Sequence, residues 1–337
     1  MGNIKPLFIL EIANNHLGSL KHGKRIIREM SEVCKGFTDR FDFAVKFQFR
    51  ELDSFIHPAY RDRTDIKNVK RFRDTRLGME EFRALLCKAR EQGFKAICTP
   101  FDEPSVDNIV KLGFDYIKIA SCSFGDWPLL EIIAAARLPV IASTAGCDLE
   151  LIDKVVSFFE HRKIELSLMH CIAEYPTPLN RLELNQIDLL KARYPRLRVG
   201  FSTHEEPGSV YPIIAAVAKG ALIFEKHVGV PAEGLSLNAY SATPAEVKGW
   251  LEAAALAFDM CGAAGKRYEP KENELSDLAA LRRGVFVKSE EINAGKISAE
   301  EIYLAFPSAP GQFLATDLSK YTEIYLKEGS FKKDEPL

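Results

Sequence analysis

The feature that most constrains the fold of this sequence is a regular alternation of short apolar runs with amphipathic segments, which continues to about residue 260. Each apolar run is bounded by polar, Gly or Pro residues, a pattern typical of β-strands. We expect strands at eight positions: Leu7–Glu11, Phe43–Phe47, Ala96–Thr99, Tyr116–Ile119, Val140–Ser143, Leu166–His170, Arg198–Phe201 and Leu222–Glu225.

The segments between these runs carry apolar residues three and four positions apart and end in Gly or Pro, as in HGKRIIREMSEVC and GMEEFRALLCKAREQG. This spacing predicts helices. Alternating strands and helices predict a parallel sheet covered by helices. Eight repeats favour a closed (β/α)8 barrel over an open doubly wound sheet. No GxGxxG follows the first run, which continues as EIANNHLGS, and no P-loop pattern occurs.

The chain has 337 residues, which is enough for a barrel of about 250 residues and a small appendage. After Lys266 the pattern changes to a charged stretch and then to short strand-like pieces. We expect the barrel over residues 1–265, a linker over 266–277, and a small, mostly β domain over 278–337.

The formal net charge is −2, so no strong electrostatic field favours nucleic acid or an anionic membrane. No stretch approaches the roughly 20 apolar residues that span a bilayer. Seven cysteines without CxxC spacing make disulfides unexpected, and we expect a cytoplasmic protein. One segment, RDRTDIKNVKRFRDTR over Arg61–Arg76, is strongly basic. It is either a solvated loop and helix start or a basic lip that attracts an anionic substrate.

Polar side chains at the carboxyl ends of barrel strands are typical of active sites. Nearly every expected strand in this chain ends on such residues: Glu11, Asn15 and His16; Lys46 and Gln48; Thr99 and Asp102; Lys118 and Ser121; Ser143 and Thr144; His170 and Tyr175; Ser202 and His204; Glu225, Lys226 and His227.

His204 and His227 follow two consecutive expected strands. They are either structural residues or metal ligands. Neutral imidazoles suit Mn, Fe, Co or Zn, and two of them without a third protein ligand would leave positions for water and substrate.

Lys46, Lys118 and Lys226 form a second constellation, because lysines inside a barrel mouth require a partner. They either form salt bridges, such as Lys46 with Glu11 or Lys226 with Glu225, or bind a phosphate or carboxylate. Neighbouring hydroxyl groups favour a phosphorylated small acid as ligand. Cys98, Cys122 and Cys171 also lie near strand ends, but we do not expect a thiol nucleophile there.

Eight segments in chain order resemble the N-acetylneuraminate (sialic acid) synthase family: EIANNHLGS, VKFQ, TPFD, YIKIASCSFGDWPLL, PVIASTAG, LMHCIAEYPTP, VGFSTH and FEKHVGV. The tail segment LRRGVFVKSEEINAGKISAEEI resembles a shortened antifreeze-like (SAF) domain. The resemblance implies a barrel enzyme that condenses phosphoenolpyruvate with an N-acetylated amino sugar, releases phosphate and forms homodimers. It also implies a divalent metal, typically Mn, with Mg, Co or Zn as alternatives, held by His204 and His227.

Matching the motifs residue by residue gives a phosphoenolpyruvate site and a sugar side on which Tyr175 lies. The phosphoenolpyruvate site implied in this way consists of Lys46, Gln48, Thr99, Lys118, Ser121, Ser143 and Ser202.

Several positions depart from the family pattern. Ser123 stands where the family has a Glu that handles the attacking water, and Ala173 stands where it has an Asn. The family Asp that holds sugar hydroxyls is missing, so Asn238 becomes the nearest polar candidate. The tail lacks the RPG motif. We therefore take Glu174, which follows Ala173, as a candidate catalytic carboxylate, together with Lys118 and Glu11.

The sequence thus predicts a metal-dependent condensation of phosphoenolpyruvate with an altered aldose, which would give a 2-keto-3-deoxy acid. Two alternatives stay open. One is a metal-dependent aldolase or lyase on the same barrel, which would tolerate the loss of the Glu. The other is a binding protein that has kept the pocket and lost the chemistry.

Overall fold

The computed structural model describes residues 5–232, 237–319 and 324–337. The chain divides into two compact units, Met1–Gly262 and Ala263–Leu337. None of the helices in the described ranges is long and apolar enough to cross a membrane.

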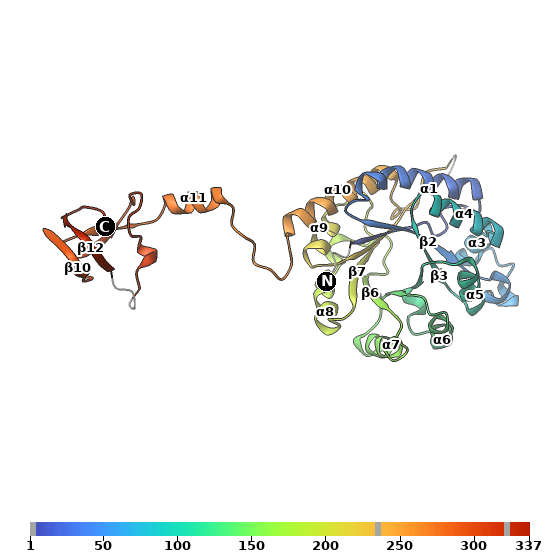
Figure 1. Cartoon of the computed structure of the whole chain (residues 1–337). Helices are drawn as coiled ribbons and strands as arrows, with labels where there is room; N and C mark the ends of the chain where they lie inside the picture. The colour runs from blue at the N-terminus through green and yellow to red at the C-terminus, as the bar shows by residue number, and fades with distance from the viewer. Residues whose placement is uncertain (1–4, 233–236, 320–323) are drawn as a thin grey trace. The chain divides into compact units, whose positions relative to one another are not determined.

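The first unit is a barrel of parallel strands (Figure 1). The strands pair in chain order, and β8 pairs back onto β1 to close the barrel. This confirms the predicted fold class, and every expected strand overlaps an observed one. The strands are β1 Leu7–Glu11, β2 Asp42–Phe49, β3 Lys95–Pro100, β4 Tyr116–Ile119, β5 Val140–Ser143, β6 Leu166–Cys171, β7 Arg198–Thr203 and β8 Ile223–His227.

Helices surround the barrel (Figure 1). Side-chain caps fix several of their starts; Ser19, for example, accepts a hydrogen bond from the backbone N–H of His22. The main helices are α1 Leu20–Cys34, α4 Met79–Glu91, α5 Glu103–Leu112, α6 Trp127–Ala135, α7 Leu149–His161, α8 Asn185–Arg193, α9 Tyr211–Ala218 and α10 Pro244–Cys261. Two short helices, α2 Leu52–Phe55 and α3 Lys67–Asp74, lie in the connection between β2 and α4.

The strands bury apolar side chains on both faces, because alternate residues point into the barrel and out toward the helices. On β1, Phe8 and Leu10 belong to the outer core beneath the helices. Leu7 and Ile9 belong to a smaller core inside the barrel. The remaining fully buried members of the inner core are Ala44, Ile97, Ile141, Met169 and Ile223.

This inner core determines which residues reach the carboxyl end of the barrel. A residue two positions after an inner-core residue points into the same interior, one layer nearer the mouth. Such residues are polar on most strands: Glu11 follows Ile9, Lys46 and then Gln48 follow Ala44, Thr99 follows Ile97, Ser143 follows Ile141, and Glu225 and then His227 follow Ile223.

The second unit is small and mostly β, as expected. It contains α11 Glu272–Ala280 and the strands β9 Gly284–Val287, β10 Glu291–Ile297, β11 Ile302–Ala305 and β12 Ile324–Lys332. β10 pairs with β12 and β9 pairs with β11, both antiparallel. The core of this unit includes Val285, Ile297 and Leu326. The helix α11 occupies part of the segment that the sequence predicted as a linker.

The contact between β7 and β8 leaves no room for a side chain at Gly200, where a Cβ would collide with the backbone carbonyl and side chain of Ile223. We expect Gly200→Ala to lower the free energy of unfolding by about 1–3 kcal/mol in urea denaturation. Gly249→Ala is the matched control: Gly249 lies in α10, a Cβ there meets no neighbour, and alanine should stabilise the helix by up to about 1 kcal/mol. A Gly200→Ala protein of unchanged stability would contradict this packing.

Candidate active site

The carboxyl ends of the barrel strands line a cavity of about 930 Å³. All predicted substrate-binding residues lie in its wall, and so do Lys118 and the two candidate metal ligands. These residues are Lys46, Gln48, Thr99, Lys118, Ser121, Ser143, Tyr175, Ser202, His204, His227 and Asn238. The cavity thus forms at the end of the barrel where active sites of this fold are found.

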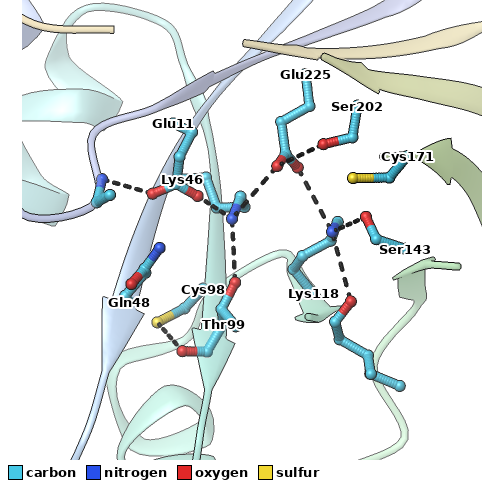
Figure 2. A network of polar contacts seen from close by, with 12 residues as sticks. Glu11, Lys46, Gln48, Cys98, Thr99, Lys118, Ser143, Cys171, Ser202 and Glu225 are labelled. Atoms are coloured by element: carbon cyan, nitrogen blue, oxygen red, sulfur yellow. Dashed lines mark hydrogen bonds and ion pairs between the residues drawn. The ribbon is translucent and has the colours of Figure 1, made fainter. Parts of the chain in front are cut away.

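A network of buried charges crosses the bottom of the cavity (Figure 2). The ammonium group of Lys46 is ion-paired with Glu11 and donates a hydrogen bond of 3.1 Å to Thr99 Oγ1. It also lies 3.6 Å from Glu225 Oε1. The second ammonium group, that of Lys118, donates to Ser143 Oγ at 2.5 Å and lies 3.8 Å from Glu225 Oε2. Glu225 is therefore shared by the two lysines.

The charges in this network balance, since two ammonium groups face two carboxylates. Burial lowers the pKa of Lys46 to about 8. Burial alone would raise the pKa of Glu225, but Lys118 and Lys46 together lower it to about 2. Ser202 donates a further hydrogen bond of 3.2 Å to Glu225. Glu225 is therefore ionised at neutral pH, and an incoming anion would compete with it for the lysines.

His204 and His227 lie side by side at the cavity wall, with ring centroids 5.4 Å apart. The Nδ1 atom of His204 lies 2.9 Å from the carbonyl of Ile172, so it carries the proton and leaves Nε2 as a free electron-pair donor. The Nδ1 atom of His227 is buried and has no hydrogen-bond partner among the described residues. Tyr175 packs against His204, and Tyr240 packs against His227.

The chemistry of these two imidazoles fits a metal site. Burial lowers the pKa of His204 to about 4 and that of His227 well below its usual range, so both are in the neutral form that binds metals. Within the described ranges, no group of three or more His, Cys, Asp or Glu residues could hold a metal. The pair would thus leave coordination positions open for water and substrate.

The structure does not support a carboxylate role in the cavity for Glu174. Its Oε1 atom accepts a hydrogen bond of 3.2 Å from Arg181, and Glu174 is not among the cavity-lining residues. Its neighbours Ala173 and Tyr175 both line the cavity. In an extended segment alternate residues face opposite ways, and this places Glu174 outside.

Glu11 and Lys226 also differ from their predicted roles. Glu11 reaches the site only through Lys46, so it is a positioning residue. Lys226 follows Glu225 directly and therefore points away from the cavity. It is paired with the buried Glu205 at 2.8 Å and lies near the ring of Trp250 in α10. Of the two alternatives for Lys226, the salt bridge is therefore confirmed and the anion site is not, but the partner is Glu205 and not the expected Glu225.

Sequence reasoning missed several cavity residues: Arg50, Lys67, Arg71 and Tyr240 as wall residues, and Glu225 as the carboxylate between the lysines. The two-residue period of strands could have found two of them, since Glu225 lies midway between Ile223 and His227, and Arg50 lies two residues after Gln48. Cys171 lines the cavity, but burial raises the pKa of its thiol to about 11, which disfavours a nucleophilic thiolate.

The NeuB family profile matches residues 41–266, which is more than half of the chain. The chain belongs to the NeuB family. A Chromobacterium violaceum protein assigned as spore coat polysaccharide biosynthesis protein E has a crystal structure with a TM-score of 0.95 and 50% sequence identity, over 99% of this chain and 98% of that one.

Two further relatives of this NeuB-family chain are named as enzymes. The N-acetylneuraminic acid (sialic acid) synthetase of Leptospira borgpetersenii, solved in complex with citrate, is 27% identical with a TM-score of 0.71, over 82% of this chain and 94% of that one. The N,N'-diacetyllegionaminic acid synthase of Legionella pneumophila is 29% identical over 91% of this chain and 87% of its own length.

The ion pair between Lys226 and Glu205 is buried outside the cavity, so its loss should affect stability more than ligand binding. We expect Glu205→Gln to lower the free energy of unfolding by about 3–5 kcal/mol, because Lys226 would keep a buried charge without a partner. Chemical denaturation measures this. Glu206→Gln changes the exposed neighbouring residue and should leave the stability nearly unchanged. Equal effects of the two substitutions would refute the structural role of the pair.

Proposed function

We propose that this protein condenses phosphoenolpyruvate with an aldose to give a 2-keto-3-deoxy sugar acid and phosphate. The observation that carries the proposal is the pair of buried lysines, surrounded by hydroxyl groups and lying in one cavity with two free imidazoles, inside a barrel of the NeuB family. The relatives named as sialic acid and legionaminic acid synthases support a sugar acid as product.

The reaction forms one carbon–carbon bond. The enol carbon C3 of phosphoenolpyruvate attacks the aldehyde carbon of the aldose, and the aldehyde oxygen takes up a proton. A water oxygen adds to C2, which then expels the phosphate and becomes the new keto group. Phosphoenolpyruvate, aldose and water are consumed, and the keto acid and phosphate are formed, so atoms and charges balance without an oxidant or reductant.

Phosphoenolpyruvate carries a carboxylate and a phosphate, which suit the bottom of the cavity. Lys46 and Lys118 supply charge there, while Thr99, Ser143 and Ser202 supply hydroxyl groups that already contact the network. The substrate anions would take over hydrogen bonds that the lysines now share with Glu225. Because these donors are held in place by packing before the substrate arrives, little reorganisation accompanies binding.

Glu225 is the carboxylate best placed to manage the proton of the attacking water, since Ser123 stands at the family position and does not line the cavity. In the free protein the two lysines keep the pKa of Glu225 at about 2, which makes it a weak base. The negative charge of bound phosphoenolpyruvate would raise this pKa toward the range of an effective base.

His204 and His227 would hold a divalent cation, Mn in the first place and Mg, Co or Zn as alternatives. Such an ion acts as a Lewis acid on a substrate oxygen when bound. Tyr175, which packs on His204, and Gln48 would contact the aldose. A homodimer and an SAF-type tail stay predictions that rest on the family resemblance, and a cytoplasmic location stays a prediction that rests on the cysteine pattern.

We expect phosphate release when the protein is supplied with phosphoenolpyruvate, Mn and a suitable aldose, and we expect EDTA to abolish it. A phosphate assay across a panel of aldoses measures this, and His227→Ala should weaken Mn binding in calorimetry. Pyruvate formed from a keto-deoxy sugar acid would indicate an aldolase or lyase instead. Tight binding of phosphoenolpyruvate without turnover of any aldose would indicate a binding protein.

A Glu225→Gln variant separates chemistry from binding. We expect kcat to fall by about 10²-fold or more, because the base is lost. The KM for phosphoenolpyruvate should not rise, because removing a negative charge leaves the lysines freer to bind anions. Steady-state kinetics measure both constants, and Lys118→Gln is the contrasting variant, in which this KM should rise. A Glu225→Gln enzyme with unchanged kcat would exclude Glu225 as the base.

A further inference from the structure

The cavity contains a third cation, which is partly buried, in addition to the two buried lysines. Arg50 directly follows β2, two residues after Gln48 and four after Lys46, and lines the same cavity. Its guanidinium group lies between two aromatic rings, 4.1 Å from the ring centre of Phe72 in α3 and 3.6 Å from that of Phe101. This stacking holds the planar group in a fixed orientation.

Unlike the lysines, Arg50 has no carboxylate at ion-pair distance anywhere in the described ranges. Its Nη2 atom donates to Gln48 Oε1 at 3.0 Å, and its Nε atom is buried without a hydrogen-bond partner. Burial lowers the pKa of Arg50 to about 10, so the group is still charged at neutral pH. A partly buried, charged guanidinium group whose Nε atom has no hydrogen-bond partner among the described residues calls for an anionic ligand.

The basic segment before and within α3 adds two more cations, which are exposed at the cavity wall. Four of its basic residues are neutralised by acidic neighbours: Arg63 by Asp65, Lys70 by Asp74, Arg73 by Asp62 and Arg76 by Asp53. Lys67 and Arg71 have no acidic partner among the residues that the structure describes, and both line the cavity. Both cations of the segment that face the cavity therefore lack an acidic partner, whereas Arg61, which donates to the backbone carbonyls of Ile56 and Asp53, does not line the cavity.

We propose that Arg50, Lys67 and Arg71 form a subsite for an anionic group on the aldose, a phosphate or a carboxylate at the end away from the aldehyde. This inference rests on the proposed function and names the class of acceptor. Four residues of extended strand separate the Cα atoms of Lys46 and Arg50 by roughly 13 Å. An aldose that spans Gln48 would connect phosphoenolpyruvate, held at Lys46 and Lys118, with this subsite.

The test compares an N-acetylhexosamine, its 6-phosphate and the corresponding hexuronic acid as acceptors in the phosphate-release assay. The variant is Lys67→Gln with Arg71→Gln, both on the exposed helix α3. Its matched control is Lys70→Gln with Arg73→Gln, which removes two charges from the same helix that are already paired and do not line the cavity. Thermal unfolding of both proteins checks that each remains folded.

We expect the wild-type enzyme to prefer an anionic acceptor. The variant should raise the KM for that acceptor by about 10- to 100-fold and leave the KM for phosphoenolpyruvate unchanged. The control should behave like the wild type. Preference for the 6-phosphate would identify a phosphate ligand, and preference for the hexuronic acid a carboxylate. Equal use of the neutral sugar, or a raised KM for phosphoenolpyruvate instead, would overturn the proposal.

Calorimetric binding of the 6-phosphate and the hexuronic acid, without phosphoenolpyruvate or metal, keeps this test apart from the test of the proposed function. If no aldose is turned over but an anionic sugar binds the wild type and not the double variant, the condensation is wrong and the subsite is supported. If neither sugar binds, or if the variant binds them as well as the wild type, the subsite is wrong even for an active synthase.

Discussion

The mouth of this barrel depends on one buried arrangement, in which Lys46 and Lys118 share Glu225 and Lys46 also contacts Glu11. Charges in such a place are costly to desolvate unless each has partners of opposite sign and hydrogen bonds. The network meets both conditions in the free protein. It can therefore hold two ammonium groups in position until substrate anions replace part of the contacts of Glu225.

The arrangement follows from the two-residue period of the strands. Ile9, Ala44, Ile97 and Ile223 fill the lower interior of the barrel, and the inward residues that follow them are Glu11, Lys46, Thr99 and Glu225. The same period that builds a dry inner core thus delivers the polar layer directly above it. A shift of one residue in any strand would send its polar group to the helices, as the position of Lys226 demonstrates.

The sequence was sufficient to predict the eight strands, because each is a short apolar run buried on both faces. It also identified most of the cavity wall, because the carboxyl ends of all the strands in a closed parallel barrel lie together at one end. The sequence did not predict the residues for which the direction of the side chain, rather than the position in the strand, decides whether the residue lines the cavity. Lys226 and Glu174 are adjacent to cavity residues but point away from the cavity. Glu225 was named as a polar strand-end residue and as a partner of Lys226, but its contact with Lys46 and Lys118 depends on the tertiary structure.

The sequence could not identify Arg50, Lys67 and Arg71 as an anion site for a different reason. The basic segment over Arg61–Arg76 was recognisable, but which of its charges are neutralised depends on pairings such as Arg73 with Asp62 and Arg76 with Asp53. Only the folded chain separates the paired cations from the unpaired ones. That separation favours the interpretation of the segment as a basic lip, because Lys67 and Arg71 line the cavity and have no acidic partner among the described residues.

The charge of the cavity wall differs between the bottom of the cavity and the side toward α3. At the bottom, the positive charges of Lys46 and Lys118 are balanced by Glu11 and Glu225, so an anion gains there mainly by exchanging hydrogen bonds. Toward α3, the charges of Arg50, Lys67 and Arg71 are uncompensated and attract anions over a longer range. A phosphoenolpyruvate molecule is thus retained at the bottom by the protein's hydrogen-bond donors, which are arranged to fit its anionic groups. The outer cations, in contrast, can discriminate among acceptor sugars by the charge of the sugar alone.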